Sequence, residues 1–183
     1  KEYGFLDHAV CLKIAEEIAK EKFCKFSSFQ EAMDAGIRVA IAYTTLGVVS
    51  TPLEGYTFFK IKKTKQDTDY ISSYFSGPIR SAGGTAAAFS LVIIDYLRET
   101  FGYVKYDPTE QEIKRTVTET LDYHDYITNL QYLPTGQELK FIASNLPIQV
   151  NGEPSEEREV SNYKDLDRIE TNRLRSGVCL ILA

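Results

Sequence analysis

The residues best suited to bind an anion lie in the segment GPIRSAGGT, residues 77–85. Pro78 fixes its own φ and interrupts regular structure, whereas Gly83 and Gly84 accept a positive φ or the close approach of another backbone. An apolar run follows at once, so these glycines stand at the start of a predicted helix. Backbone N–H groups and a partial positive charge at a helix start favour an anion, and Arg80 adds a full charge.

We call Gly83, Gly84 and Thr85 the anion-ready turn. The turn is not a P-loop, because no Lys-Ser or Lys-Thr pair follows the glycines, and it is not G-x-G-x-x-G. A structural alternative is that the glycines let a core helix pack tightly while Arg80 pairs with a carboxylate. Residue chemistry alone leaves both interpretations open.

A second candidate for anion binding is a cluster of lysines after the alternating residues of a predicted strand. The cluster, which we call the basic strand, consists of Lys60, Lys62, Lys63 and Lys65. The net charge of −5 argues against a surface that holds nucleic acid by itself, so any DNA contact requires such a local patch. The alternative is an edge strand whose charges block pairing with another sheet.

No catalytic constellation is present in the sequence. There is no G-x-S-x-G, no H-E-x-x-H, and the two histidines lie far apart. Asp67 and Asp69 have D-x-D spacing, but their polar turn beside the lysines favours turn chemistry over a metal pair. His124 lies near the inner stripe of a predicted helix and is predicted to be structural. We therefore expect no catalytic residue, metal ligand or cofactor in this chain.

Length and composition are those of an ordinary soluble globular protein, with room for one domain with a real core or for two small ones. The chain has 183 residues, 43% apolar and 26% charged, and no apolar stretch approaches the ~20 residues that span a bilayer. Cys11, Cys24 and Cys179 form no metal pattern and are predicted to be reduced, buried thiols of a cytoplasmic protein. The chain starts without Met and stops inside the apolar run 177–183, which predicts a fragment of a longer protein.

The first half of the sequence predicts two helices, a strand and a buried helix. Asp7 caps a helix over 8–23, and Ser28 with Glu31 forms a capping box for a helix over 29–46, which should pack antiparallel to the first. An extended connector over 47–55 then leads to a strand over 56–64. The helix over 85–101 is apolar nearly all round, so it should be buried on most sides, with Arg98 near the end where it returns to water and Gly102 ending it.

The second half predicts two further helices and a hairpin. Asp107 as N-cap opens a helix to about residue 131, whose inner stripe is Ile113, Val117, Leu121 and Ile127. Thr135 and Glu138 form a capping box for a helix to about residue 145. Residues 147–150 suit a strand, and Asn151-Gly152 indicates a hairpin. The fold class is thus α+β: a mostly helical domain with a small, largely antiparallel sheet and one long buried central helix, with residues 145–183 as a candidate β-rich sub-region.

Several long segments resemble the large subunit of archaeal family D DNA polymerase. The segment over 74–90, YFSGPIRSAGGTAAAFS, resembles the hallmark segment of that family. The others follow in the family's order: GVVSTPLEG over 47–55, TNLQYLP over 128–134, NLPIQVNGEPSEEREVS over 145–161 and RIETNRLRSGVCLILA over 168–183. The resemblance covers nearly the whole chain.

The resemblance implies that residues 1–183 are a single N-terminal domain fragment of the polymerising subunit, a nucleotidyltransferase. The family's metal-binding aspartates lie in double-psi β-barrels downstream, so Mg²⁺ is expected for the whole polymerase and none for this fragment. The implied role is subunit assembly and DNA binding during replication, with 3′–5′ exonuclease activity in the small subunit of the complex. Implied partners are the small subunit, DNA, the rest of the large subunit and a homodimer partner, with no membrane. The alternative is a pure assembly scaffold without DNA contact.

Overall fold

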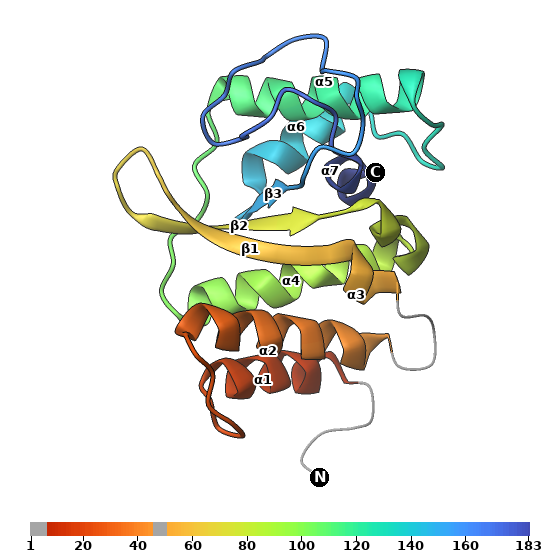
Figure 1. Cartoon of the computed structure of the whole chain (residues 1–183). Coiled ribbons are helices and arrows are strands. Elements are labelled where there is room, and N and C mark those ends of the chain that lie inside the picture. The colour runs from red at the N-terminus through yellow and green to blue at the C-terminus, as the bar shows by residue number, and fades with distance from the viewer. Residues whose placement is uncertain (1–6, 46–50) are drawn as a thin grey trace.

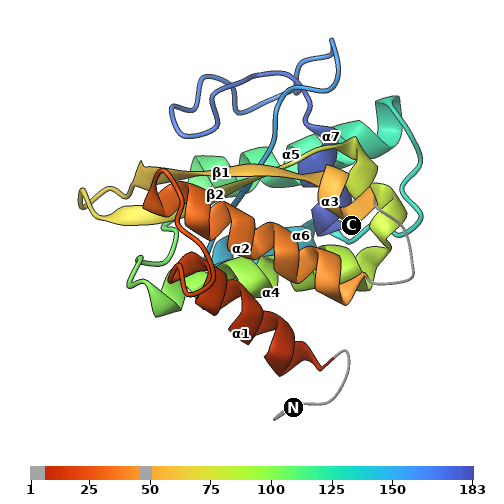
Figure 2. The ribbon, with the colours of Figure 1, turned by 60° about the horizontal axis from the view of Figure 1, so that its bottom comes forward.

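The computed structural model describes residues 7–45 and 51–183, and these form helical layers on both faces of a small sheet (Figure 1). One layer contains α1 (His8–Ala19), α2 (Phe29–Thr44) and α4 (Gly84–Thr100). The sheet contains β1 (Tyr56–Lys63), β2 (Asp69–Phe75) and β3 (Gln149–Asn151). The other layer contains α5 (Glu110–Tyr126), α6 (Gly136–Asn145) and α7 (Ser176–Leu182). Figure 2 shows α1, α2 and α4 side by side across one face of the sheet.

The α+β class is confirmed, and the small sheet is mixed, with a longer antiparallel pairing and a shorter parallel one. Its strand order is β1-β2-β3. β1 and β2 form an antiparallel pair in which Lys63 lies opposite Asp69, whereas β2 and β3 are parallel, with Ser72 opposite Gln149. The predicted Asn151-Gly152 hairpin is therefore wrong. Asn151 is buried, and its side-chain oxygen accepts the N–H of Gly152.

The antiparallel pairing of the first two helices is confirmed. Asp7 and Ser28 cap them through their side chains, as predicted. The thiol of Cys11 donates to the carbonyl of Ala40 at 3.2 Å. A Cβ on Gly36 would lie 2.6 Å from the carbonyl oxygen of Ala15, so this glycine permits the close approach of the two backbones.

The connector before the basic strand is partly helical, contrary to the predicted extended chain. Thr51–Gly55 forms the short helix α3, and residues 47–50 of the predicted connector lie outside the described residues. Proline is well tolerated in the first turn of a helix, where its missing N–H has no partner to lose. The proline at position 52 therefore starts this element instead of preventing it.

The helix α4 buries a charged group that the sequence pattern assigns to the surface. Arg98 near the end of α4 is buried, and it donates to Asp95, to Glu99 and to the carbonyl of Tyr103. The expectation that Arg98 returns the helix to water is wrong, because the guanidinium holds the turn after the helix. α4 also exposes Val92, so it is buried along one stripe and not on most sides.

The predicted start and inner stripe of α5 are wrong. Thr109 is the N-cap and forms a capping box with Glu112, while Asp107 binds Arg168 instead. Of the predicted stripe, Ile113 is buried but Ile127 is exposed, and the helix ends at Tyr126. Its buried face is mainly polar, with Glu112, Arg115, Glu119, Thr120, Asp122 and Tyr123 beside Ile113.

The remaining chain packs onto this polar face. Residues 152–175 form a long loop across α5 and the sheet, which Figure 1 shows in blue above the strands. Its acidic residues are mostly exposed. Cys11 and Cys179 are buried thiols, but Cys24 is exposed, so that prediction is wrong for Cys24. No helix within residues 7–45 and 51–183 is long and apolar enough to cross a membrane.

Candidate nucleic-acid interface

Arg80 and the anion-ready turn lie together at one end of β2. The strand passes at Phe75 into a 3-10 helix, η1 (Gly77–Ala82), so the segment predicted to interrupt regular structure is itself helical. Ile79 in η1 is buried and anchors the segment, while Arg80 beside it is exposed. The guanidinium of Arg80 forms no hydrogen bond or ion pair with any residue in the described part of the chain, while its backbone carbonyl accepts the N–H of Gly83. The predicted carboxylate partner of the structural alternative is absent from that part.

The start of α4 offers unpaired backbone donors next to Arg80. Gly83 is the N-cap with φ 75°, a conformation that glycine adopts without strain. No side chain caps this helix, and the N–H groups of a first helical turn have no acceptor within the helix. Arg80, Gly83 and Gly84 line a hollow of about 240 Å³ together with Gln131, Tyr132 and Leu180. Thr85 is exposed beside it. This arrangement can accept a phosphate-sized anion.

The carboxylate of Glu170 pairs with two of the four lysines of the basic strand and offsets one of their two positive charges. Lys60 and Lys62 both contact it at 2.9 Å, one ammonium on each oxygen, and the hydroxyl of Tyr74 donates to it at 2.8 Å. Burial alone would raise the pKa of Glu170, but hydrogen bonds from Lys60, Lys62 and Tyr74 lower it to about 2. Glu170 therefore stays charged at neutral pH. It supplies to these lysines the negative charge that a phosphate would otherwise supply.

The other two lysines of the basic strand are also engaged. Lys63 forms an ion pair with Asp69 at 2.9 Å, the residue opposite it in the hairpin. Lys65 has no carboxylate within ion-pair distance in the described chain, and its ammonium group lies 3.5 Å from the carbonyl of Pro108. Asp69 is the first residue of β2 and pairs with a lysine across the strands, so it lies just after the polar turn to which its sequence assigned it.

The Lys63 end of the basic strand and the anion-ready turn lie at opposite ends of β2, whereas Lys60 lies opposite Ser72, about midway along the strand. Lys63, the last residue of β1, lies beside the start of β2. Arg80 follows the other end of β2. Seven residues of strand separate the two ends, roughly 20 Å at the usual rise per residue. Figure 1 shows the β1–β2 turn and η1 at opposite sides of the molecule. A nucleic acid would reach these groups as two separate contacts.

A buried ionic cluster on α5 fixes the long loop that supplies Glu170. Glu119 is fully buried, and it accepts hydrogen bonds from Arg175 at 2.6 Å and Arg115 at 3.1 Å. Burial opposes the charge on Glu119, but the charge and hydrogen bonds of Arg175, together with Arg115, lower its pKa. Arg175 also donates to Asn151 on β3 at 2.6 Å. The cluster joins α5, β3 and the start of α7.

The same cluster reaches the loop backbone. Arg115 donates to the carbonyls of Tyr163, Thr171 and Arg173. A second pair lies at the start of α5, where Arg168 contacts Asp107 and Glu112, each at 2.6 Å. These residues on both sides of Glu170 set its position over the lysines. Sequence reasoning missed the cluster, although charged residues at positions 112, 115 and 119 share one helical face and give a weak signal for it.

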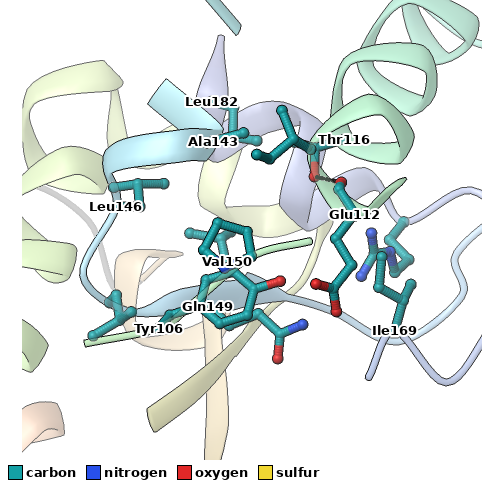
Figure 3. Close-up of a pocket in the computed structure, with 13 residues that line it drawn as sticks. Tyr106, Glu112, Thr116, Ala143, Leu146, Gln149, Val150, Ile169 and Leu182 are labelled. Atoms are coloured by element: carbon teal, nitrogen blue, oxygen red, sulfur yellow. Dashed lines mark hydrogen bonds between the residues drawn. The ribbon is translucent and has the colours of Figure 1, made fainter. Parts of the chain in front are cut away.

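A small cavity beside this cluster is a packing feature and not a ligand site. Figure 3 shows it between α5, α6 and β3, with Glu112, Thr116, Gln149 and Val150 around it. The hydroxyl of Thr116 donates to the carbonyl of Glu112 at 3.0 Å. The cavity volume of about 30 Å³ has room for a water molecule. Ligand pockets are about ten times larger.

His124 also has a structural role, as predicted. Its Nδ1 accepts the backbone N–H of Leu130 at 3.0 Å, which fixes the turn after α5. Among the residues that the structure describes, no group of three or more histidine, cysteine or acidic residues is placed to hold a metal ion. Arg80, the anion-ready turn and the lysines of the basic strand remain the candidates for contact with an anion.

Comparisons with known proteins match the chain along its whole length. The family model described as DNA polymerase II large subunit DP2, N-terminal, matches residues 4–183. A DNA polymerase II large subunit from Nanoarchaeum equitans is 44% identical over 183 residues, which is 100% of this chain and 15% of that protein. The proteins of the same name from Methanocella arvoryzae and Archaeoglobus fulgidus are 43% and 42% identical over 94% and 100% of this chain. The chain spans 15–16% of the length of these relatives.

Proposed function

Because the chain belongs to the family of DNA polymerase II large subunits, the archaeal family D polymerases, we propose that it is the N-terminal, non-catalytic domain of such a subunit. In this proposal it supports subunit assembly and DNA binding during template-directed replication. The observation that carries the proposal is the match of residues 4–183 to the N-terminal family model. Polymerisation, with its Mg²⁺, belongs to the rest of the large subunit, and the exonuclease activity to the complex with the small subunit.

We propose that Arg80 and the anion-ready turn contact one DNA backbone phosphate. The unpaired guanidinium supplies the charge, and the uncapped N–H groups of α4 supply directional donors. This contact is independent of sequence, because phosphates carry no base information. It therefore suits a polymerase, which must hold every template.

The first prediction tests this contact in the holoenzyme. Arg80→Ala should weaken DNA binding severalfold and lower the slope of log affinity against log salt by about one, because one phosphate contact is lost. Binding is measured by fluorescence anisotropy with primed DNA at several salt concentrations. Lys25→Ala is the control, since it removes the same charge from an exposed position between α1 and α2. Equal behaviour of the two variants would exclude the Arg80 contact.

The second prediction concerns Glu170, which competes with phosphate for Lys60 and Lys62. Glu170→Gln should strengthen DNA binding and steepen the salt dependence by about one, because the half-exposed ammonium group of Lys60 becomes free for a phosphate. Lys62, by contrast, is 12% exposed and still donates to the carbonyl of Arg168. Glutamine keeps the size of the side chain and its bond with Tyr74. The same anisotropy titration measures the effect.

Glu153→Gln is the matched control for Glu170→Gln, because it removes an equal charge from an exposed position of the same loop. A larger effect at position 170 supports lysine contacts with DNA. Equal effects would mean that only the general charge of the loop matters, and Lys60 and Lys62 would then be structural.

The second candidate function is a pure assembly scaffold. It is favoured by the net charge of −5 and by the ion pairs that already occupy Lys60, Lys62 and Lys63. In this alternative the lysines only stabilise the loop and protect the edge of the sheet. The two titrations separate the candidates, since the scaffold predicts that both test variants bind DNA as their controls do.

A further inference from the structure

The structure exposes an apolar groove between α6, the segment before it and the end of α7. Its walls are Tyr132, Pro134, Phe141, Ile142 and Leu182, and its volume is about 500 Å³. Tyr132 is 60% exposed and Phe141 is 70% exposed, which places two large aromatic side chains in solvent on one face. Adjacent exposed aromatics of this size are characteristic of interaction surfaces.

The fold of α6 does not require this exposure. Its capping box of Thr135 and Glu138 fixes the start of the helix. Leu139 is fully buried and packs in one cluster with Val178 and Leu182, which attaches α6 to α7. Phe141 lies on a different side of the helix from Leu139. The exposed phenylalanine therefore adds nothing to the attachment of α6.

The chemistry of the groove selects an apolar partner. Its one acidic side chain, Glu138, already accepts the backbone N–H and hydroxyl of Thr135. Gln137 contributes a side-chain amide to the lining, and no basic side chain among the described residues is part of it. A nucleic acid would find no cation here, whereas the apolar face of a helix or strand would find aromatic and aliphatic contacts.

We propose that this groove receives an apolar segment of the same large subunit, from the part that follows the residue aligned with Ala183. The inference rests on the proposed function. This chain covers 15–16% of its relatives and matches their N-terminal family model, so most of each relative follows the matched region. Leu182 and Ala183 themselves line the groove. The chain that follows this position in a relative therefore starts beside the surface, at high effective concentration.

The test measures whether the groove is covered in the full-length large subunit. A thiol is introduced by Phe141→Cys, and its alkylation rate is compared by mass spectrometry with that of the native Cys24, which is exposed on the opposite helical layer. We expect the thiol at position 141 to react at least tenfold more slowly than Cys24. Tyr132→Cys provides a second, independent probe of the same groove, and unchanged circular dichroism confirms that each variant is folded.

The outcomes identify the occupant. Slow alkylation in the isolated large subunit, independent of protein concentration, supports the proposal. Similar rates at positions 141 and 24 would overturn it. Protection that needs high protein concentration would assign the groove to a second copy, and protection that needs the small subunit would assign it to that partner; both also overturn it. DNA affinity of the same samples is measured separately, so loss of the proposed DNA contact leaves the result on the groove intact.

Discussion

Glu119→Gln should lower the free energy of unfolding by about 3–5 kcal/mol, because it leaves two buried guanidinium groups without a counter-charge. Arg115 and Arg175 both donate to this carboxylate, and all three side chains are at most 1% exposed. The amide of glutamine would direct hydrogen-bond donors at the donors of an arginine. Urea denaturation, followed by circular dichroism, measures the loss, and urea avoids screening the charges.

Glu110→Gln is the matched control, since it makes the same substitution on the same helix. Glu110 is half exposed and lies 3.5 Å from Lys114 and 3.6 Å from Lys140. Such surface pairs contribute at most about 1 kcal/mol. If Glu119→Gln unfolded as late in urea as Glu110→Gln, the buried cluster would not hold the fold together.

Gly177→Ala should also destabilise the protein strongly, by about 3 kcal/mol or more. A Cβ at this position in α7 would lie 2.1 Å from the carbonyl oxygen of Phe75 and 2.6 Å from the backbone nitrogen of Ser76. Both contacts involve backbone, which cannot rotate away as a side chain can. The helix would have to leave the end of β2, and we expect a melting temperature lower by about 6–12 °C.

The test is whether the melting temperature falls or rises, because alanine normally stabilises a helix by up to about 1 kcal/mol relative to glycine. Gly136→Ala in α6 provides the comparison. Its Cβ would meet only a side-chain carbon of Val117 at an ordinary 3.8 Å. We expect the melting temperature of Gly136→Ala to stay level or rise. A similar rise for Gly177→Ala would contradict the close contact of α7 with β2.

Features decided within a few residues were predictable from the sequence. Asp7, Ser28 and Thr135 cap their helices as expected, because each cap depends on a side chain and on N–H groups two or three residues away. The stop at Gly102 is local in the same sense. The start of α5 failed because Asp107 and Thr109 are both good caps, and Arg168, far away in sequence, takes the first of them.

Features that depend on distant partners were not predictable. The buried side of α5 is polar, and a hydrophobic stripe cannot reveal it, since its stability comes from Arg168 and Arg175 in a loop more than forty residues later. Asn151-Gly152 indicated a hairpin from local turn chemistry alone. Tertiary context overrode it, because β3 pairs with β2 and Asn151 binds Arg175.

The candidate interface was predicted in composition but not in arrangement. The sequence pattern placed Gly83 and Gly84 at a helix start, with a positive φ or a close backbone contact expected for both; Gly83 has the positive φ, and Gly84 has neither feature. It could not show that Glu170, which lies in a loop without periodic structure, covers Lys60 and Lys62. A run of lysines without acidic neighbours in the sequence therefore does not show how much of its positive charge stays unpaired in the folded chain.

The parallel pairing of β2 with β3 has a consequence for biosynthesis. Ser72 and Gln149 are neighbours in the sheet, but translation at about 5–20 residues per second separates them by roughly 4–15 s. During that interval one edge of β2 lacks its partner, and an open strand edge is a template for misassociation. Gly177 later allows α7 to pack closely against the end of the same strand. The nascent chain therefore passes through a vulnerable stage that ends only after β3 and α7 have been synthesised.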